Sequence, residues 1–156
     1  MRDTPAVLFR KARLEDLGAI LALLNDGKVD NVLERIEDPL PSLYTEAFAA
    51  IEADPNQMLL VGEIEGRIVA SLQLTFIPGI AHQGAWRAQV EVVRVAQDLR
   101  GRGIGEAMMR HVISLARARG CALVQLTTNK ARDDAQRFYR RLGFTASHEG
   151  MKLKLR

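Results

Sequence analysis

One stretch of the chain, residues 86–127, restricts the fold more than any other. It opens with a strand pattern over residues 86–95 and passes through a loop rich in glycine and arginine. The apolar i, i+4 stripe of an amphipathic helix then runs over residues 104–119, and a continuous apolar run over residues 122–127 is typical of a buried strand. A strand, a helix and a strand in this order predict two parallel strands joined by a helical crossover, so the expected fold class is α/β.

The other periodic segments extend this unit into a mixed sheet that is mostly antiparallel and has about seven strands. The further strand patterns cover residues 9–11, 57–64, 67–77, 144–147 and 151–155. Helix patterns begin near Leu14, at Ser42, where the serine is expected to cap the helix, and at Asp133. The predicted order is therefore βααβββαβαββ. With 156 residues and no linker or repeat, the chain is expected to form a single domain over residues 1–156.

Composition narrows the range of partners. The chain is 47% hydrophobic and 26% charged, its apolar runs are far shorter than the roughly 18 residues of a membrane span, and its first residues lack an apolar secretion segment. Cys121 is the single cysteine and cannot form an intrachain disulfide, which favours a reducing compartment. We therefore expect a cytoplasmic protein with no membrane partner.

Charge is unevenly divided along the sequence. Residues 1–99 hold 9 Lys/Arg and 15 Asp/Glu, whereas residues 100–156 hold 13 Lys/Arg and 4 Asp/Glu. This division fits either an anionic ligand near the basic half and a cationic one near the acidic half, or two ordinary solvated surfaces. The chain is only 5% aromatic and has no stripe of interleaved aromatic and basic residues, so nucleic acid is not an expected partner.

The loop over residues 100–105, with the sequence RGRGIG, has the properties of a phosphate-binding turn. Its glycines let the backbone approach a ligand closely, and the first amides of the following helix have no partner within that helix. Arg100 and Arg102 add forked, charged donors. The loop has neither the lysine and hydroxyl of a Walker motif nor the glycine spacing of a dinucleotide fingerprint. The alternative is a glycine-rich turn with solvated arginines.

The pattern Arg-x-x-Gly-x-Gly over residues 100–105 resembles the acyl-CoA pyrophosphate loop of the GNAT N-acetyltransferase superfamily. The strand Val92-Val93-Arg94-Val95 precedes it at the family's distance, and residues 138–144 resemble the family's Tyr-x-x-x-Gly-Phe element. The resemblance is best over residues 90–144, and it implies a GNAT-like domain whose two parallel strands splay apart.

The resemblance also implies an activity. It predicts an acetyl-CoA-dependent N-acetyltransferase that moves an acetyl group to a primary amine of a small molecule or peptide, by direct attack in a ternary complex. The alternative is a CoA-binding sensor or interaction module with a degenerate active site. A homodimer is a family expectation.

Cofactor contacts follow from the same resemblance. Main-chain groups of Val93 and Val95 are expected to bond the pantetheine arm. The amides expected to hold the pyrophosphate are those of Arg100, Gly101, Arg102, Gly103, Ile104 and Gly105. Many family members carry an asparagine seven residues before the motif tyrosine, where this chain has Arg132. Asn129 lies three residues earlier, and both residues are candidates for cofactor binding.

Two residues are expected to carry the chemistry. Glu91, on the strand before the loop, is the candidate general base, although it is equally read as an ordinary strand carboxylate. His82 and Glu149 are weaker candidates for the same role. Tyr139 is the candidate acid that protonates the CoA thiolate, and its alternative role is packing beside its aromatic neighbours.

The remaining candidates concern the acceptor and metals. In the family the first part of the chain forms the acceptor wall, which here is acidic and contains Asp26, Asp30, Glu34, Glu37 and Asp38. These side chains either attract a cationic amine or are simply solvated, and Trp86 either lines an acceptor pocket or anchors the sheet edge. Cys121 is expected to be a structural thiol. The histidines and Cys121 lack metal-ligand spacing, so no metal is expected.

Overall fold

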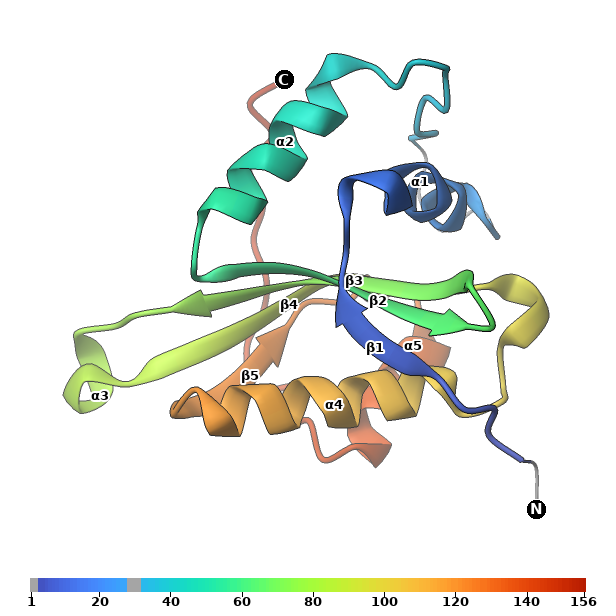
Figure 1. The fold of residues 1–156 in the computed structure, drawn as a ribbon. Helices are drawn as coiled ribbons and strands as arrows, with labels where there is room; N and C mark the ends of the chain where they lie inside the picture. The colour runs from blue at the N-terminus through green and yellow to red at the C-terminus, as the bar shows by residue number, and fades with distance from the viewer. Residues whose placement is uncertain (1–2, 28–31) are drawn as a thin grey trace. The chain divides into compact units, whose positions relative to one another are not determined.

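A computed structural model describes residues 3–27 and 32–156 of the chain. The chain separates into two compact units, residues 1–125 and 126–156, which are described in turn as the first and the second unit. The first unit is built on a sheet of five strands in the order β1-β2-β3-β4-β5 (Figure 1). The fold is therefore α/β, with five strands among the described residues in place of the expected seven.

The five strands agree closely with the sequence pattern. They are β1 (Leu8–Lys11), β2 (Gln57–Ile64), β3 (Arg67–Ile77), β4 (Trp86–Val95) and β5 (Cys121–Leu126). The first four pair antiparallel with their neighbours. Glu65 and Gly66 form the turn between β2 and β3 with φ of 48° and 81°, the positive values that a tight two-residue hairpin turn requires. The chain reaches β5, the neighbour of β4, through a helix, and the sheet is mixed (Figure 1).

Helices cover both faces of this sheet. On one face lie α1 (Leu17–Asn25), which follows the short 3-10 helix η1 (Leu14–Asp16), and α2 (Ser42–Ala53), whereas α4 (Ile104–Ala118) covers the other face (Figure 1). Ser42 begins α2 as expected, but the capping position is Pro41 and no side chain caps the helix. The short α3 (Ala81–Gly84) is a tight connection in which His82 and Gln83 have positive φ.

The two faces of the sheet differ in composition because strand side chains alternate between them. The α4 face is apolar and fully covered, and its buried side chains include Leu60, Leu72, Leu74, Met108 and Val112. The α1/α2 face has an apolar cluster under the helices, formed by Leu17, Ile20, Phe48 and Val61. Burying each of these large side chains stabilises the fold by about 1.5–3 kcal/mol.

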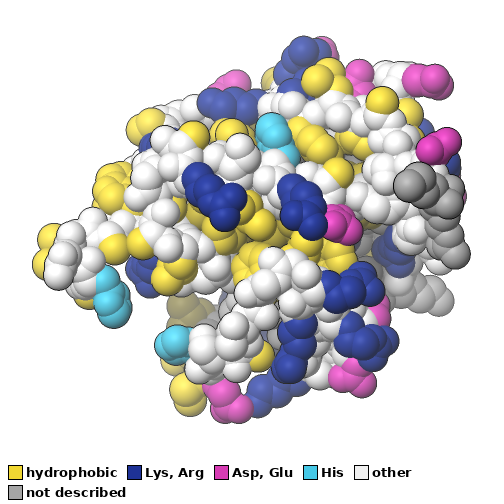
Figure 2. Space-filling view, turned by 90° about the horizontal axis from the view of Figure 1, so that it is seen from below, with side chains coloured by type: hydrophobic (Ala, Val, Ile, Leu, Met, Phe, Trp, Pro, Cys, Tyr) yellow, Lys and Arg dark blue, Asp and Glu magenta, His cyan; other side chains and the backbone are white. Residues whose placement is uncertain are grey.

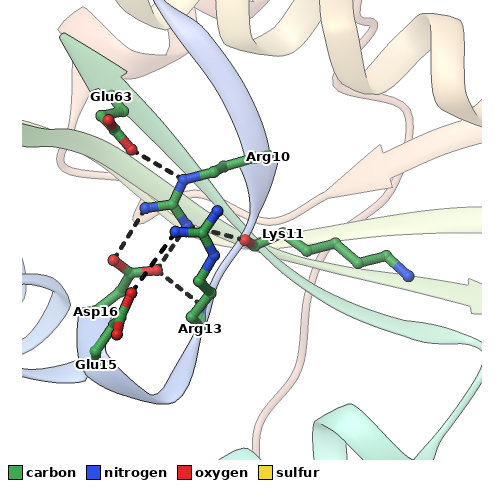
Figure 3. A network of polar contacts seen from close by, with 6 residues as sticks. All are labelled: Arg10, Lys11, Arg13, Glu15, Asp16 and Glu63. Atoms are coloured by element: carbon green, nitrogen blue, oxygen red, sulfur yellow. Dashed lines mark hydrogen bonds and ion pairs between the residues drawn. The ribbon is translucent and has the colours of Figure 1, made fainter. Parts of the chain in front are cut away.

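A buried ion-pair network fastens the start of α1 to the sheet (Figure 3). Arg10 of β1 donates two hydrogen bonds to the carboxylate of Asp16, at 2.7 and 3.0 Å, and a third to Glu63 of β2 at 2.9 Å. The Arg13 amide donates to the same Asp16 carboxylate at 2.7 Å. Arg10 and the Arg13 amide together lower the pKa of Asp16 below its ordinary value.

The second unit contains α5 (Asp133–Arg141) and the C-terminal segment. The strands expected over residues 144–147 and 151–155 are absent from the described structure, so this part of the prediction was wrong. The alternating Met151, Leu153 and Leu155 are at least 87% exposed, and period-two alternation does not form a strand unless a neighbouring strand pairs with it. The buried character predicted for β5 was also wrong, because Leu123 is 47% exposed.

Candidate functional site

In the first unit, β4 contains a bulge between Glu91, the candidate base, and Val95, a candidate cofactor-binding residue. Glu91 lies opposite Gln73 of β3 and Arg94 lies opposite Ser71, so two residues of β4 face the single residue between them. One of the two is Val92, whose φ of 55° is rare for a β-branched residue. The bulge turns the side chain of Arg94 to the same face as that of Glu91, although their spacing in an unbroken strand would place them on opposite faces.

After the bulge, the amide and carbonyl of Val95 point away from β3. The Ala96 amide donates to the Val69 carbonyl at 2.8 Å, so Val95 turns its own amide and carbonyl to the other side. Arginine side chains donate hydrogen bonds to two main-chain carbonyls in this part of β4. The Val93 carbonyl accepts a hydrogen bond from Arg94 at 3.0 Å, and the Val95 carbonyl accepts one from Arg100 at 3.3 Å.

The glycine loop leads directly into α4. Gly101 and Gly103 have φ of 75° and 82°, and Gly103 is the capping residue of the helix, with no side chain capping it. The first-turn amides of α4, which have no partner within the helix, and the helix dipole favour an anion at this end. A Cβ at Gly103 would lie 2.8 Å from Oγ1 of Thr4. Ile104, the first residue of the helix, is only 1% exposed as a whole residue, so neither its side chain nor its amide is open to solvent in this structure.

Contacts from distant parts of the chain hold the base of this loop. Asp26, just after α1, accepts a hydrogen bond from the Gln97 amide at 2.8 Å. Gln97 begins the 3-10 helix η2 (Gln97–Leu99), where Asp98 forms two 2.9 Å bonds with Arg67 of β3. The Arg100 guanidinium lies against Gly27, since a Cβ there would be 2.9 Å from Nη2. Arg100 is therefore directed toward Gly27 and Val95 in this structure.

The second unit places Tyr139 in a defined helix terminus. The Phe144 amide bonds the Tyr139 carbonyl at 3.1 Å, and the Gly143 amide bonds the Arg140 carbonyl at 3.0 Å. Gly143 has φ of 97°, which completes a Schellman motif at the end of α5. The Tyr139 ring meets the Phe138 and Phe144 rings edge-on, at 5.0 and 5.7 Å between centroids. The sequence element Tyr-x-x-x-Gly-Phe is thus a helix-ending device that holds the tyrosine ring.

Other predicted site residues of the second unit have local partners. The Asn129 side chain accepts a hydrogen bond from the Ala131 amide at 3.0 Å, which stabilises the turn before α5. Arg132 is the capping residue of that helix and is exposed. Glu149, one of the weaker candidate bases, forms a 3.1 Å ion pair with Lys130.

Candidate acidic groups of the first unit fall into two kinds. Glu91 is exposed on β4, and the described structure gives it no hydrogen bond or ion pair. Most of the expected acidic acceptor rim has internal partners: Asp26 bonds Gln97, Glu34 accepts the Tyr44 hydroxyl at 2.6 Å, and Glu37 pairs with Arg35. Asp38 is exposed, and Asp30 lies outside the described residues.

Several other groups contribute little to a site. His82 is exposed in α3, and Trp86 is half-buried at the start of β4. Burial raises the pKa of the Cys121 thiol, which favours the unreactive form. Residues 3–27 and 32–156 contain no group of three or more acidic, histidine or cysteine side chains that could hold a metal ion. In the same ranges no helix has the length and apolar character needed to cross a membrane.

Figure 2 views the molecule from the side that carries α4. Lys and Arg side chains are spread over this face among uncharged and hydrophobic ones, in keeping with the basic character of residues 100–156. They form no continuous basic stripe in this view.

Comparison with known proteins identifies the family. Residues 20–144 match the Acetyltransferase (GNAT) family. The chain is 30% identical to aminoalkylphosphonate N-acetyltransferase of Salmonella typhimurium over 92% of its own length and 88% of that protein. It is 31% identical to glucosamine 6-phosphate N-acetyltransferase 1 of Oryza sativa, over 97% and 88% of the two chains.

A solved structure agrees with this assignment at the level of fold. The crystal structure of a protein described as a transcriptional regulator from Bacillus halodurans C-125 superposes with a TM-score of 0.89 and 44% identity, covering 96% of this chain and all of that one.

The chain therefore belongs to the GNAT family of acetyltransferases. It is an acyltransferase that uses acetyl-CoA as donor and transfers the acetyl group to an amine.

Proposed function

We propose that the acceptor is the primary amine of a small molecule that also carries an anionic group. The two relatives compared above are named for an aminoalkylphosphonate and for glucosamine 6-phosphate, and both compounds combine an amine with a phosphorus oxyanion. The charge pattern of residues 1–99 is consistent with an amine that arrives as a cation.

The cofactor half of the proposal rests on the bulge of β4 and the loop that follows it. The Val95 main chain faces away from β3, and Gly101 and Gly103 of the glycine loop have left-handed backbones just before α4. These features fit a long ligand with a polar arm and a diphosphate. Val93 and Val95 would bond the arm, and the amides of residues 100–105 would hold the diphosphate. Acetyl-CoA, when bound, supplies an activated thioester.

The roles of the side chains follow from their chemistry. The acceptor amine must lose a proton before it can attack, and the exposed carboxylate of Glu91, directly or through water, would remove it. The amine nitrogen then forms the amide bond while the carbon–sulfur bond breaks. The departing sulfur needs a proton, and the Tyr139 hydroxyl would donate it. Asn129 and Arg132 would contribute to cofactor binding. The whole chain, residues 1–156, would act as one domain.

The direct test uses the full chain and two measurements. Binding of CoA is measured by titration calorimetry, and thiol release from acetyl-CoA is measured with a panel of small amines with and without anionic groups. The proposal expects CoA binding and faster thiol release with the anionic amines. Absence of CoA binding would refute the cofactor site. Thiol release that favours peptide amines would refute the proposed acceptor.

A further inference from the structure

The α1/α2 face of the sheet changes character toward the end that carries α3. Beyond the apolar cluster under α1 and α2, this face carries mostly polar side chains, which are half-buried except for the exposed Glu91, whereas the buried side chains of the α4 face are apolar. Strand alternation and the register of β2, β3 and β4 place six polar side chains on this face: Gln57, Gln73, Thr75, Arg87, Gln89 and Glu91. We call them the polar row. A half-buried polar surface next to a candidate base needs a ligand or water to satisfy it.

Hydrogen bonds order the middle of the polar row. Oε1 of Gln57 accepts hydrogen bonds from Gln73 at 3.2 Å and from the Thr75 hydroxyl at 2.9 Å. On β4, Oε1 of Gln89 accepts a 2.6 Å hydrogen bond from Gln125. These are the only side-chain hydrogen bonds of the polar row in the described part of the chain, so each glutamine keeps donor or acceptor capacity for a ligand.

Gln73 stands directly opposite Glu91 in the β3–β4 register. Side chains in such opposed positions have Cβ atoms about 4.5–5.5 Å apart, so both can contact one small molecule. A ligand amine beside Glu91 would therefore have the Gln73 amide next to it. An amide that donates and accepts is suited to a hydroxyl on the carbon adjacent to the amine.

The far end of the row carries a positive charge. Arg87 lies opposite Ile77 on the same face, is half-buried, and has no hydrogen bond or ion pair with any described residue. A half-buried guanidinium without an internal partner is free to bind an anionic ligand group. Along β4 the order is thus carboxylate, amide and guanidinium, at Glu91, Gln89 and Arg87. Alternate residues of a strand are about 6.6 Å apart, so the two charged positions are separated by about 13 Å at the backbone.

We infer that the polar row is the acceptor-recognition surface, with Arg87 and Gln73 as specificity-determining residues. The substrate class is an extended amine with a hydroxylated middle and an anionic group at the far end, such as an amino-sugar phosphate. Glu91 meets the amine, Gln73 and its neighbours bond the hydroxyls, and Arg87 binds the anion. This inference rests on the proposed function and specifies the acceptor of the same site.

The test compares glucosamine 6-phosphate with glucosamine as acceptors for the wild type and for two variants. Arg87→Gln removes the guanidinium charge at a residue that has no hydrogen bond or ion pair with any described residue, so the fold should be retained. Gln73→Leu removes the amide with little change in volume, and its melting temperature is checked against the wild type. Arg117→Gln, an exposed arginine on α4, is the control for loss of one positive charge.

The wild type should favour the phosphorylated acceptor. Arg87→Gln should raise KM for glucosamine 6-phosphate about tenfold or more, leave glucosamine unchanged within about twofold, and keep kcat nearly constant, because the lost contact binds ground state and transition state alike. Gln73→Leu should raise KM for both amines. Calorimetric binding of glucosamine 6-phosphate without acetyl-CoA should weaken in the same two variants and not in Arg117→Gln.

Equal discrimination by the wild type and Arg87→Gln would overturn the inference. So would a wild type that prefers an aminoalkylphosphonate, whose amine and anion are too close together to span the row. If CoA binds and amines release thiol but neither variant changes the preference, the inference fails while the proposed function stands. If CoA does not bind, the proposed function fails.

Discussion

Gly103 offers the sharpest test of the diphosphate site, because the same helix provides its control. Gly103 precedes α4 with φ of 82°, and Gly120 follows that helix with φ of 78°. A side chain at either position forces an L-residue into the left-handed region. A Cβ at Gly103 would meet Thr4 at 2.8 Å, whereas a Cβ at Gly120 has nothing within 4 Å. The two glycines therefore share a backbone cost and differ in what lies beside them.

The expected magnitudes separate stability from binding. Alanine at either position should lower the free energy of unfolding by about 1–2 kcal/mol, the cost of the left-handed conformation for an L-residue. The Thr4 contact adds little, since a side-chain terminus can rotate away. For a chain of this size, each kcal/mol lowers the melting temperature by about 2–4 °C. Gly120→Ala should leave CoA affinity unchanged.

Gly103→Glu adds a negative charge where the diphosphate is expected. At a separation of about 5 Å and an effective dielectric constant of about 20, the repulsion is roughly 3 kcal/mol, or more than a hundredfold in affinity. Calorimetric titration with CoA measures the affinity, and thermal melting of Gly103→Glu and Gly120→Glu compares the stability loss. Similar melting temperatures with CoA binding lost only in Gly103→Glu would support the site. CoA affinity in Gly103→Glu equal to that of Gly120→Glu would refute the reasoning.

Three further outcomes are expected. Tyr139→Phe should lower kcat while CoA affinity changes little, because only the proton donor is lost; unchanged turnover in stopped-flow thiol release would leave Tyr139 a packing residue. Glu91→Gln should lower kcat while CoA affinity changes little, and unchanged turnover would assign the base elsewhere. Asp16→Asn should lower the free energy of unfolding, measured by urea denaturation, by about 2–3 kcal/mol. This is somewhat less than the loss of a whole buried ion pair, because Arg10 keeps its bond to Glu63. The pKa of Asp16 is lowered in the folded state. Its carboxylate therefore stabilises the protein fully above the unfolded pKa near 3.9. This stability is lost as pH falls through the lower folded pKa. The Asn variant should therefore show a flatter acid dependence, and an unchanged slope would contradict the assignment.

The sequence predicted the first five strands and the long helix well because their signals are local. Period-two patterns, the Glu65-Gly66 turn and the i, i+4 stripe of α4 depend on residues close together in the chain. The C-terminal segment failed for the opposite reason. Its alternation at Met151, Leu153 and Leu155 has the period of a strand, but a strand exists only where a partner strand pairs with it, and a one-dimensional pattern carries no information on pairing.

The candidate site was predictable where a backbone requirement leaves a residue signature. Left-handed turns require glycine, and Gly101, Gly103 and Gly143 could therefore be recognised in the sequence. The bulge at Val92 could not, because valine is a typical strand residue and gives no sign of a positive φ. The polar row was missed for a related reason: its members come from three strands, and only the register brings Gln73 opposite Glu91.

The helix ending at Gly143 has a consequence for how distant relatives are recognised. Its two hydrogen bonds depend on a glycine that can adopt a left-handed backbone, and the rings of Tyr139 and Phe144 meet edge-on. A chain with phenylalanine in place of Tyr139 would end its last helix in the same way and would still align over this element. The spacing of the Tyr-x-x-x-Gly-Phe element therefore indicates the geometry of the helix ending and not a catalytic role. If Tyr139 is the proton donor, as we propose, the single oxygen atom on that ring would distinguish a chain able to protonate a leaving thiolate from one that has kept the architecture alone.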